Sequence, residues 1–154
     1  GAGLAAQQVN KAMQFFVMDI GGDGSDVPFD YRLDGRTPPL PLIMPIAVCN
    51  PEIVPIGEDT ETSDEGCLSF PGMNLEGVQR PFAIRMRYQD LDGNAHTLEC
   101  NGFLARCCQH EYDHLQGTLF IDRVPKSELK KHESHLKKLN KQSHDYLKSA
   151  KKEA

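Results

Sequence analysis

The chain has 154 residues, of which 39% are hydrophobic and 25% charged, and its formal net charge is −5. It has no Trp and no apolar run near the length of a membrane span, so composition excludes a helical membrane protein and predicts one soluble domain with a modest core. Five Cys, an odd number, follow no disulfide framework or CxxC spacing, which indicates reduced thiols in the cytosol or inside an organelle.

The N-terminal part combines a glycine-rich start, a strand and a long loop. Residues 1–8 (GAGLAAQQ) contain two glycines and three alanines, which let the backbone approach a ligand or another strand closely. A tight turn leading into a helix start explains the same pattern. Residues 13–20 are rich in β-forming side chains and predict a strand. Residues 21–45 hold five prolines and several turn dipeptides, which predicts an extended surface loop without regular structure.

The next segment predicts a strand followed by a second loop. Residues 46–56 have the composition of a strand, and Pro51 and Pro55 predict that it lies at an edge of the sheet, because proline cannot donate to a neighbouring strand. The acidic run at residues 58–65 predicts a solvated loop for most of its members.

A hairpin and a helix follow one another directly. Residues 82–88 and 95–100 alternate apolar and polar side chains around an Asp-Gly-Asn turn, which is the strongest hairpin signal in the chain. Asn101 is then a favourable N-cap, and Gly117 supplies a C-terminal stop. Between them, apolar residues recur at helical spacing, so we expect one amphipathic helix.

The predicted helix carries the sequence QHEYDHLQG. Residues four apart in a helix lie one above the other, so His110 and His114 can direct their rings at one metal ion. Glu111 lies beside them, where its carboxylate can reach a water on the metal without ligating the metal itself. Two buried core histidines are the alternative explanation. The intervening Glu favours a metal site.

The C-terminal part predicts a short strand near residues 118–121 and a last helix from Ser127 to about residue 150. Residues 126–154 carry nine lysines against four acidic residues, whereas residues 1–125 carry 8 basic against 18 acidic residues. The basic face is either a solvated helix surface or a contact for an anionic partner such as ribosomal RNA. Strands that precede two late helices predict an α+β fold.

Two histidines leave a metal short of ligands, because catalytic zinc-type sites use three protein donors and one open position. The HExxHxxGxxH peptidase pattern would supply a third His, but Phe120 stands at that position. A downstream Glu, either Glu128 or Glu133, is a second candidate, as in other HExxH peptidases. Cys67 is the third candidate, through its thiolate. The local sequence leaves these alternatives open.

Three motifs resemble those of a known family. GAGLAAQQ at residues 1–8, EGCLS at residues 65–69 and QHEYDHLQG at residues 109–117 are similar to the three signature motifs of peptide deformylases, in that family's order. The resemblance implies an α+β fold in which antiparallel β-sheets surround a central metal-binding HExxH helix, with a C-terminal helix of the bacterial type.

The resemblance also implies a domain organisation. It spans residues 1 to about 125. Members of the family have several tens of residues ahead of the first motif, and the present sequence begins inside that motif. We therefore expect residues 1–154 to be a single catalytic domain that lacks the family's N-terminal segment, with residues 126–154 as its basic C-terminal helix.

Individual residues take roles from the resemblance. The implied metal ligands are Cys67, His110 and His114. The implied catalytic residues are the general acid/base Glu111 and two oxyanion donors, the side chain of Gln8 and the backbone N–H of Leu68. The implied substrate-binding residues are Gly3 and Gly66. Arg106 stands where an apolar pocket-lining residue is expected, which predicts a shifted substrate preference.

The implied reaction removes the formyl group from the N-terminal formyl-methionine of nascent peptides. The implied cofactor is one divalent ion, Fe(II) natively, with Zn, Ni or Co able to occupy the site. The ion is expected to lower the pKa of a bound water, so that Glu111 can take a proton from it. The resulting hydroxide attacks the formyl carbon, and the products are formate and a free N-terminus. The expected partners are formyl-methionyl nascent peptides and, through the basic C-terminal helix, the ribosome. No membrane partner is expected. The expected location is a bacterial-type cytoplasm or the interior of an organelle.

Two other hypotheses remain open from the sequence. The first is a zinc endopeptidase that uses His110, His114 and a downstream Glu. The second is a non-catalytic, ribosome-associated metal-binding module that depends on the lysine-rich C-terminus. Against the second, Glu111 has no task in a closed structural site, whereas an open site needs a base.

Overall fold

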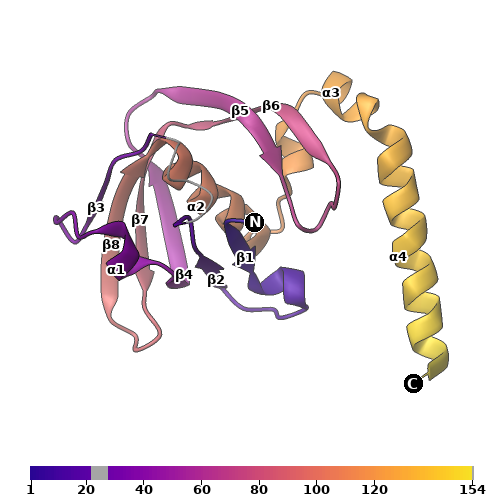
Figure 1. The fold of residues 1–154 in the computed structure, drawn as a ribbon, viewed down its shortest axis with the longest axis horizontal. Helices are drawn as coiled ribbons and strands as arrows, with labels where there is room; N and C mark the ends of the chain where they lie inside the picture. Colours follow the sequence, from indigo (N-terminus) through magenta and orange to yellow (C-terminus); the bar gives the residue numbers. More distant parts are fainter. Residues whose placement is uncertain (22–27, 154) are drawn as a thin grey trace.

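A computed structural model describes residues 1–21 and 28–153 of the chain (Figure 1). Among these residues, six strands form one antiparallel sheet and two strands form another. The larger sheet has the spatial order β1 (Gly3–Ala5), β2 (Phe15–Met18), β4 (Ile46–Pro55), β7 (Ala83–Gln89), β8 (Ala95–Asn101) and β3 (Tyr31–Leu33). The smaller sheet pairs β5 (Thr60–Gly66) with β6 (Asn74–Pro81). The predicted α+β class with antiparallel sheets is confirmed.

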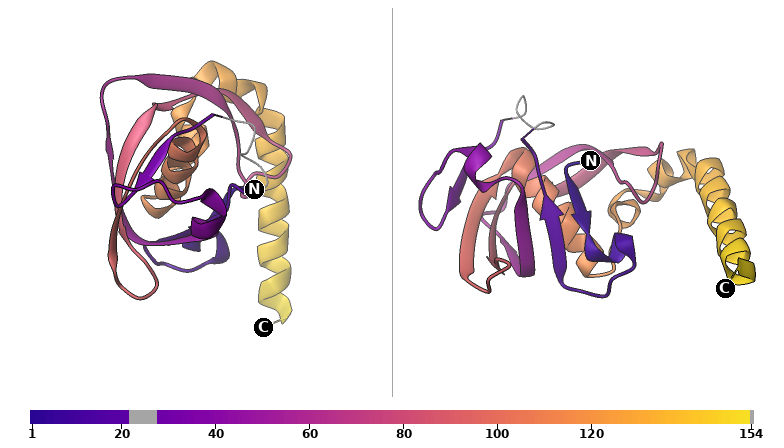
Figure 2. Two further views of the ribbon diagram at one scale, coloured as in Figure 1. Left: turned by 60° about the vertical axis from the view of Figure 1, so that its left-hand side comes forward. Right: turned by 60° about the horizontal axis from the view of Figure 1, so that its bottom comes forward.

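Helix α2 (Gly102–Leu115) lies at the centre of the molecule, with strands of both sheets around it (Figures 1 and 2). Its apolar residues pack against the inward side chains of the larger sheet and form the main core with them. In β7, for example, Ile84, Met86 and Tyr88 are buried and alternate with exposed residues, as expected for a strand with one face against a core. This arrangement confirms the central HExxH helix that the family resemblance implies.

The predicted hairpin is confirmed. Strands β7 and β8 pair from Ala83 opposite Asn101 to Gln89 opposite Ala95. At the turn, the Asp90 carboxylate accepts the backbone N–H of Asn94 at 2.9 Å, which stabilises the tight reversal. Asn101 does occupy the N-cap position of α2, but its side chain makes no capping bond because its Oδ1 accepts the backbone N–H of Asp30.

The remaining elements cover the ends of this framework. They are the 3-10 turns η1 (Ala6–Val9) and η2 (Phe120–Arg123) and the helices α1 (Leu40–Ile43), α3 (Lys126–Lys131) and α4 (Glu133–Glu153). A second, smaller core joins β6 to η2 through Leu75, Val78 and Phe120. Within the described residues, none of the helices is both long and apolar enough to cross a membrane.

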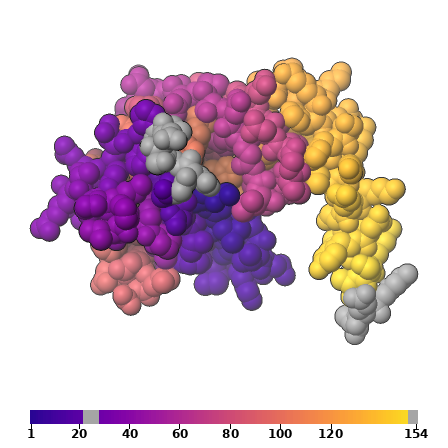
Figure 3. All heavy atoms as spheres, viewed as in Figure 1, coloured from indigo at the N-terminus to yellow at the C-terminus, as the bar shows by residue number. Residues whose placement is uncertain are grey.

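Helix α4 extends away from the body of the molecule (Figures 1 and 2), and the space-filling view shows it as a separate arm (Figure 3). Near its start, Leu136 packs against the smaller core, whereas Tyr146 and Leu147 are exposed. The single helix predicted from Ser127 is two helices, because α3 ends at Lys131, His132 caps it, and α4 begins at Glu133.

The prediction of an irregular loop at residues 21–45 is wrong for part of that range. Residues 22–27 lie outside the described residues. Strand β3 forms because its backbone pairs with β8, a long-range partner that local composition cannot reveal. Helix α1 tolerates Pro41 because proline is compatible with the first turn of a helix.

Strand β4 is also placed differently from the prediction. It lies between β2 and β7, inside the sheet, although it contains two prolines. The pairing register with β7 shifts between Cys49 and Glu52, and Asn50 has a φ of 50°, so Pro51 stands in a β-bulge where its missing N–H interrupts no ladder bond. Pro55 ends the strand.

Two further segments differ from their predicted conformation. The acidic run is mostly strand β5, which pairs with β6, rather than a loop; most of its residues are exposed, as predicted, but Glu65 is buried. The strand predicted near residues 118–121 is the turn η2. There the Asp122 carboxylate accepts the backbone N–H of Leu119 at 2.9 Å, a local bond that competes with strand pairing, while Phe120 fills the smaller core.

Candidate metal centre

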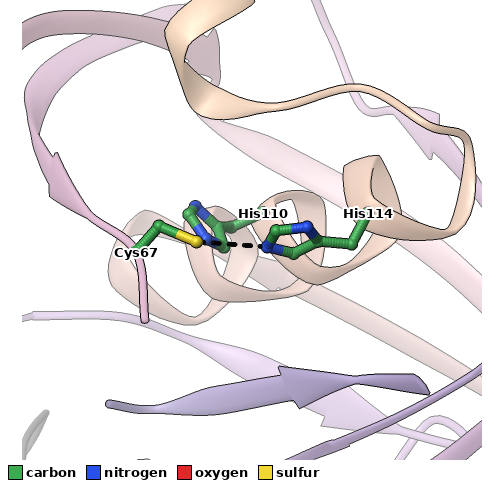
Figure 4. A group of neighbouring side chains, drawn as sticks. All are labelled: Cys67, His110 and His114. Atoms are coloured by element: carbon green, nitrogen blue, oxygen red, sulfur yellow. Dashed lines mark hydrogen bonds between the residues drawn. The ribbon is translucent and has the colours of Figure 1, made fainter. Parts of the chain in front are cut away.

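Three side chains that can bind a metal meet beside α2. His110 and His114 lie one turn apart on the helix, and their ring centroids are 5.2 Å apart. Cys67 follows directly after the end of β5. Its Sγ lies 3.3 Å from His114 Nε2, and the ligand atoms of all three residues lie within 4.8 Å of one another (Figure 4). The structure thus brings together the two predicted His and one of the candidate third ligands.

The geometry and chemistry of these donors fit a divalent transition metal. A tetrahedral ion with a sulfur ligand at about 2.3 Å and a nitrogen ligand at about 2.05 Å places those two atoms about 3.5 Å apart, close to the observed separation. A thiolate with two imidazoles suits Fe, Co, Ni or Zn better than Mg or Ca, which prefer oxygen. Three protein ligands also leave one coordination position for a water or a substrate.

The surroundings of Cys67 lower the pKa of its thiol, which favours metal binding. Burial raises the pKa of its thiol, but hydrogen bonds to His110 and His114 outweigh burial and bring the pKa to about 6. The thiolate is therefore the main form at neutral pH, and the thiolate is the form that binds metals. Burial lowers the pKa of His110, but hydrogen bonds to Cys67 and Glu65 raise it to about 9, so metal binding at neutral pH must displace a proton from His110.

Glu111 lines the same cavity as Cys67 and His110 but does not belong to the group of three metal-binding side chains. The cavity has a volume of about 230 Å³ and is lined by residues of the first motif, of the segment around Cys67 and of α2. Glu111 is buried, and its Oε2 has no hydrogen-bond partner among the described residues. Burial raises the pKa of its carboxyl, which suits a group that takes and returns a proton.

Gln8 is oriented with its donor toward the centre. The backbone N–H of Ala5 donates to Gln8 Oε1 at 2.8 Å, which directs the amide nitrogen the other way. Gln8 Nε2 lies 3.1 Å from Ser69 Oγ and 3.9 Å from Cys67 Sγ. The amide N–H groups are therefore available beside the cysteine ligand. Leu68, the residue after that ligand, also lines the cavity.

A buried ionic network supports the histidine ligands. His110 Nδ1 lies 3.0 Å from Glu65 Oε2, so the ring is held from the side opposite to a metal bound at Nε2. Arg80 Nη2 donates to the same Glu65 oxygen at 2.8 Å, and Arg80 Nη1 donates to Asp113 Oδ2 at 2.8 Å. Burial raises the pKa of Glu65, but bonds from Arg80 and His110 dominate and lower it to about 2.

A family model described as polypeptide deformylase matches residues 1–130. The chain belongs to the polypeptide deformylase family. The match covers both sheets, α2 and η2, and so contains all residues of the metal centre.

Similar sequences and structures agree with this assignment. The chain is 53% identical over 127 residues to the peptide deformylase of Opitutus terrae, a match that covers 82% of this chain and 65% of that protein. It is 42% identical over 137 residues to the peptide deformylase of a Synechococcus strain, covering 86% of this chain and 59% of that protein. The chain thus spans about two thirds or less of the length of these relatives.

Solved structures of the family also resemble the fold. The peptide deformylase of Thermus thermophilus has a TM-score of 0.73 at 34% identity, with 92% of this chain and 75% of that chain covered. The peptide deformylase of Synechococcus elongatus, solved in complex with actinonin, has a TM-score of 0.69 at 38% identity, with 90% and 65% covered.

The other candidate ligands lie elsewhere. Glu128 accepts the backbone N–H of Glu76 and pairs with Lys131, and Glu133 pairs with Lys137. Phe120, at the position of the peptidase third His, packs in the smaller core. Among the described residues, Cys67 is therefore the candidate that joins the histidines. Gly3 and Gly66, for which the family resemblance implies substrate binding, both line the cavity.

Sequence reasoning missed the supporting residues. Glu65 belongs to the acidic run and Ser69 to the EGCLS motif, but no local pattern indicates a supporting function for either residue. Arg80 lies on β6 and is only 1% exposed. Because charged side chains are usually exposed, an arginine in a strand sequence gives no local signal that it is buried. The matching charge of Glu65 lies 15 residues away, so only the pairing of β5 with β6 reveals the contact.

Proposed function

We propose that this chain is the catalytic part of a metal-dependent hydrolase that removes the N-formyl group from formyl-methionine at the start of nascent polypeptides and releases formate. The supporting observation is the convergence of Cys67, His110 and His114, two of which line one cavity together with the buried Glu111. The family supports the choice of a formyl amide as substrate.

In the proposed reaction, each side chain has one task. Cys67, His110 and His114 would hold the ion, Fe(II) by expectation with Zn, Ni or Co as alternatives, which would supply the Lewis acidity that lowers the pKa of a water. Glu111 Oε2 takes a proton from the attacking water and later gives it to the leaving amine. The amide of Gln8 and the backbone N–H of Leu68 stabilise the developing oxyanion, an effect of about 3 to 4 kcal/mol per donor.

The fold also provides a place for an extended peptide. Strand β1 is the first strand of its sheet, and the end of β5 belongs to a two-stranded sheet, so each presents an unpaired edge. Gly3 and Gly66 lie on these two edges and both line the cavity. A peptide can therefore add as a strand between them, with main-chain hydrogen bonds to both, and place its first side chain in the cavity.

The zinc endopeptidase remains the alternative function, and the ligand set separates the two. An endopeptidase that uses a downstream Glu predicts that Cys67→Ala still binds metal. The deformylase predicts that Cys67→Ala loses the metal, because two histidines alone leave the ion with too few protein donors. The partners already found for Glu128 and Glu133 favour the deformylase.

The proposed function is tested by an anaerobic assay of formyl-methionyl peptide hydrolysis, with the metal content measured on the same sample. We expect formate release in proportion to bound metal. Metal-loaded protein that binds one ion per chain and releases no formate would contradict the proposal. An internal peptide bond cleaved at a comparable rate would favour the endopeptidase.

We also propose that residues 1–154 act as one catalytic domain whose basic C-terminal helix contacts the ribosome. The support is the position of α4, which extends away from the body and carries most of the lysines of residues 126–154. An RNA surface attracts such a helix electrostatically. This location brings the cavity close to emerging chains, in a bacterial-type cytoplasm or within an organelle.

A further inference from the structure

The carboxylate of Glu65 bonds two residues of α2 that are one turn apart. Arg106 Nη1 donates to Glu65 Oε1 at 2.8 Å, and His110 Nδ1 lies 3.0 Å from Glu65 Oε2. Residues four apart lie on one face of a helix, so a single carboxylate can bridge them. One member of this pair is a metal ligand, and the other has no part in the proposed reaction.

Arg106 also bonds the backbone of both strands of the smaller sheet. Its Nη1 donates to the carbonyl oxygen of Val78 on β6 at 3.0 Å, and its Nη2 donates to the carbonyl oxygen of Glu61 on β5 at 2.8 Å. The side chain is only 6% exposed. A planar guanidinium with several fixed donors holds its partners in a defined orientation. Arg106 therefore sets the position of β5 relative to α2.

This position determines the spacing of the metal ligands. Strand β5 ends at Gly66, and Cys67 follows it, while His110 stands on α2 one turn after Arg106. A movement of β5 along α2 would change the distance between the thiolate and the imidazole. A rotation of the Glu65 carboxylate would turn the ring of His110. Both movements are opposed by the same guanidinium.

Arg80 shares Glu65 but has a different place in the network. It links Glu65 to Asp113 and is 1% exposed, so its removal would break two buried ion pairs at once, leaving Glu65 with Arg106 and Asp113 with Arg123 as their remaining arginine partners. Removal of Arg106 leaves Glu65 paired with Arg80. The fold therefore retains its main ion pairs without Arg106, whereas the orientation of Glu65 loses one of its anchors.

We propose that Arg106 is a positioning residue of the metal centre, which acts through Glu65 to orient His110 and to fix the separation of His110 from Cys67. The inference rests on the metal-binding part of the proposed function. It assigns Arg106 a task toward the metal in addition to its place in the cavity wall.

The test compares Co(II) affinity among variants of the full chain, by competition with a chelator. Arg106→Met keeps the length of the side chain and removes its charge and donors. Arg106→Lys keeps the charge. The matched control is Arg85→Met, which removes an arginine that pairs with Glu99 at 2.8 Å on the exposed face of β7 and β8. The ligand-field spectrum of bound Co(II) and the unfolding of metal-free protein are recorded for each.

We expect Arg106→Met to weaken Co(II) binding by about 10- to 100-fold, the range typical of residues that support metal ligands, and to alter the Co(II) spectrum. Arg106→Lys should recover part of the loss, and Arg85→Met should bind as wild type does. In a Glu65→Gln background, a change at Arg106 should have a much smaller effect, because the two act through one carboxylate.

Three outcomes would overturn the inference. The first is wild-type Co(II) affinity and spectrum in Arg106→Met, whatever its unfolding shows. The second is a loss in Arg106→Lys as large as in Arg106→Met, if the metal-free forms of both are equally destabilised, which would show a structural role alone. The third is a fully additive effect with Glu65→Gln. Failure of the wild-type chain to bind Co(II) would instead contradict the proposed function.

Discussion

The carboxylate of Glu111 lies directly against the backbone of Gly3. A Cβ atom added to Gly3 would stand 2.4 Å from Glu111 Oε1 and 2.6 Å from Glu111 Cδ, distances that real Cβ atoms do not reach. Gly3 lies on β1 with ordinary extended backbone, so its dihedral angles do not require glycine. Glycine is required because the Glu111 side chain occupies the position of a Cβ atom. The first motif thus shapes the site by lacking a side chain beside the proposed acid/base.

Substitution Gly3→Ala should therefore displace Glu111 from its place beside the water position. Because general acid–base catalysis contributes roughly 10²- to 10⁴-fold to a rate, we expect kcat to fall by about 10²-fold or more. The three atoms nearest to the added methyl group all belong to Glu111, which is not a predicted metal ligand, so metal content should stay at the wild-type level. Steady-state kinetics of formate release with metal analysis measure both quantities.

The control for this experiment is Glu111→Gln, which keeps the size of the side chain and removes its basicity. It should retain the metal and lose about 10²- to 10⁴-fold in kcat. In that background, Gly3→Ala should cause little further loss. Wild-type kcat in Gly3→Ala would contradict the steric relationship.

The orientation of Gln8 predicts different effects for two neighbouring variants. Gln8→Ala removes a proposed oxyanion donor and should lower kcat by about 10²- to 10³-fold with little change in KM. Ser69→Ala removes only the acceptor of Gln8 Nε2, while the backbone N–H of Ala5 still holds Oε1. A neutral hydrogen bond contributes about 1 kcal/mol, so the loss should be about fivefold. Equal losses in the two variants would contradict this ranking.

The exposed side of the hairpin predicts a pH dependence of stability. His96 Nδ1 lies 2.7 Å from Asp34 Oδ2, and its Nε2 lies 3.0 Å from Asp90 Oδ2. Hydrogen bonds to Asp34 and Asp90 raise the pKa of His96. The resulting stabilisation is complete below the unfolded pKa of about 6.5 and is lost as pH rises through the higher folded pKa.

The carboxylates act in the opposite direction. The hydrogen bond to His96 lowers the pKa of both Asp34 and Asp90, so their stabilisation is lost as pH falls through the folded values. We expect His96→Asn to reduce the free energy of unfolding most at about pH 5 to 6 and least near pH 9, as measured by urea unfolding. His144→Asn, at an exposed position of α4, is the control. An equal reduction at both pH values would contradict the proposed charge pairing.

Truncation after Leu139 tests the role of the C-terminal helix. The remaining chain keeps the hydrogen bond between His135 and the carbonyl oxygen of Pro71 and the packing of Leu136, so we expect the body to fold and to hydrolyse peptides as the full chain does. The removed residues 140–154 include four lysines, so ribosome affinity and its salt dependence should fall. Co-sedimentation with ribosomes at two salt concentrations measures this.

The full-length variant with Lys141→Gln and Lys148→Gln is the control, because it retains the helix and lowers its charge. It should show a weaker form of the same effect. Unchanged ribosome affinity in both forms would indicate that α4 is a solvated helix without this partner.

Local sequence patterns determined the elements whose information lies within one segment. The i, i+4 spacing of His110 and His114 requires only helical geometry, and the hairpin requires only alternation around a turn. The three motifs likewise indicated Cys67 through a family resemblance, and the structure confirms that it meets the histidines. The helix and the hairpin depend on residues that are close together in the chain, and each of the three motifs is itself a short continuous segment.

Tertiary structure alone decided the features that depend on pairing between distant segments. Local sequence left Cys67, Glu128 and Glu133 open as third ligands, and the position of β5 against α2 places the cysteine that the resemblance indicates beside the histidines. Glu65 looked solvated within an acidic run, yet it is buried because Arg80 and Arg106 reach it from other elements. A charge can be buried when its partner is buried with it, and that partner is set by the packing of sheet and helix rather than by neighbouring residues.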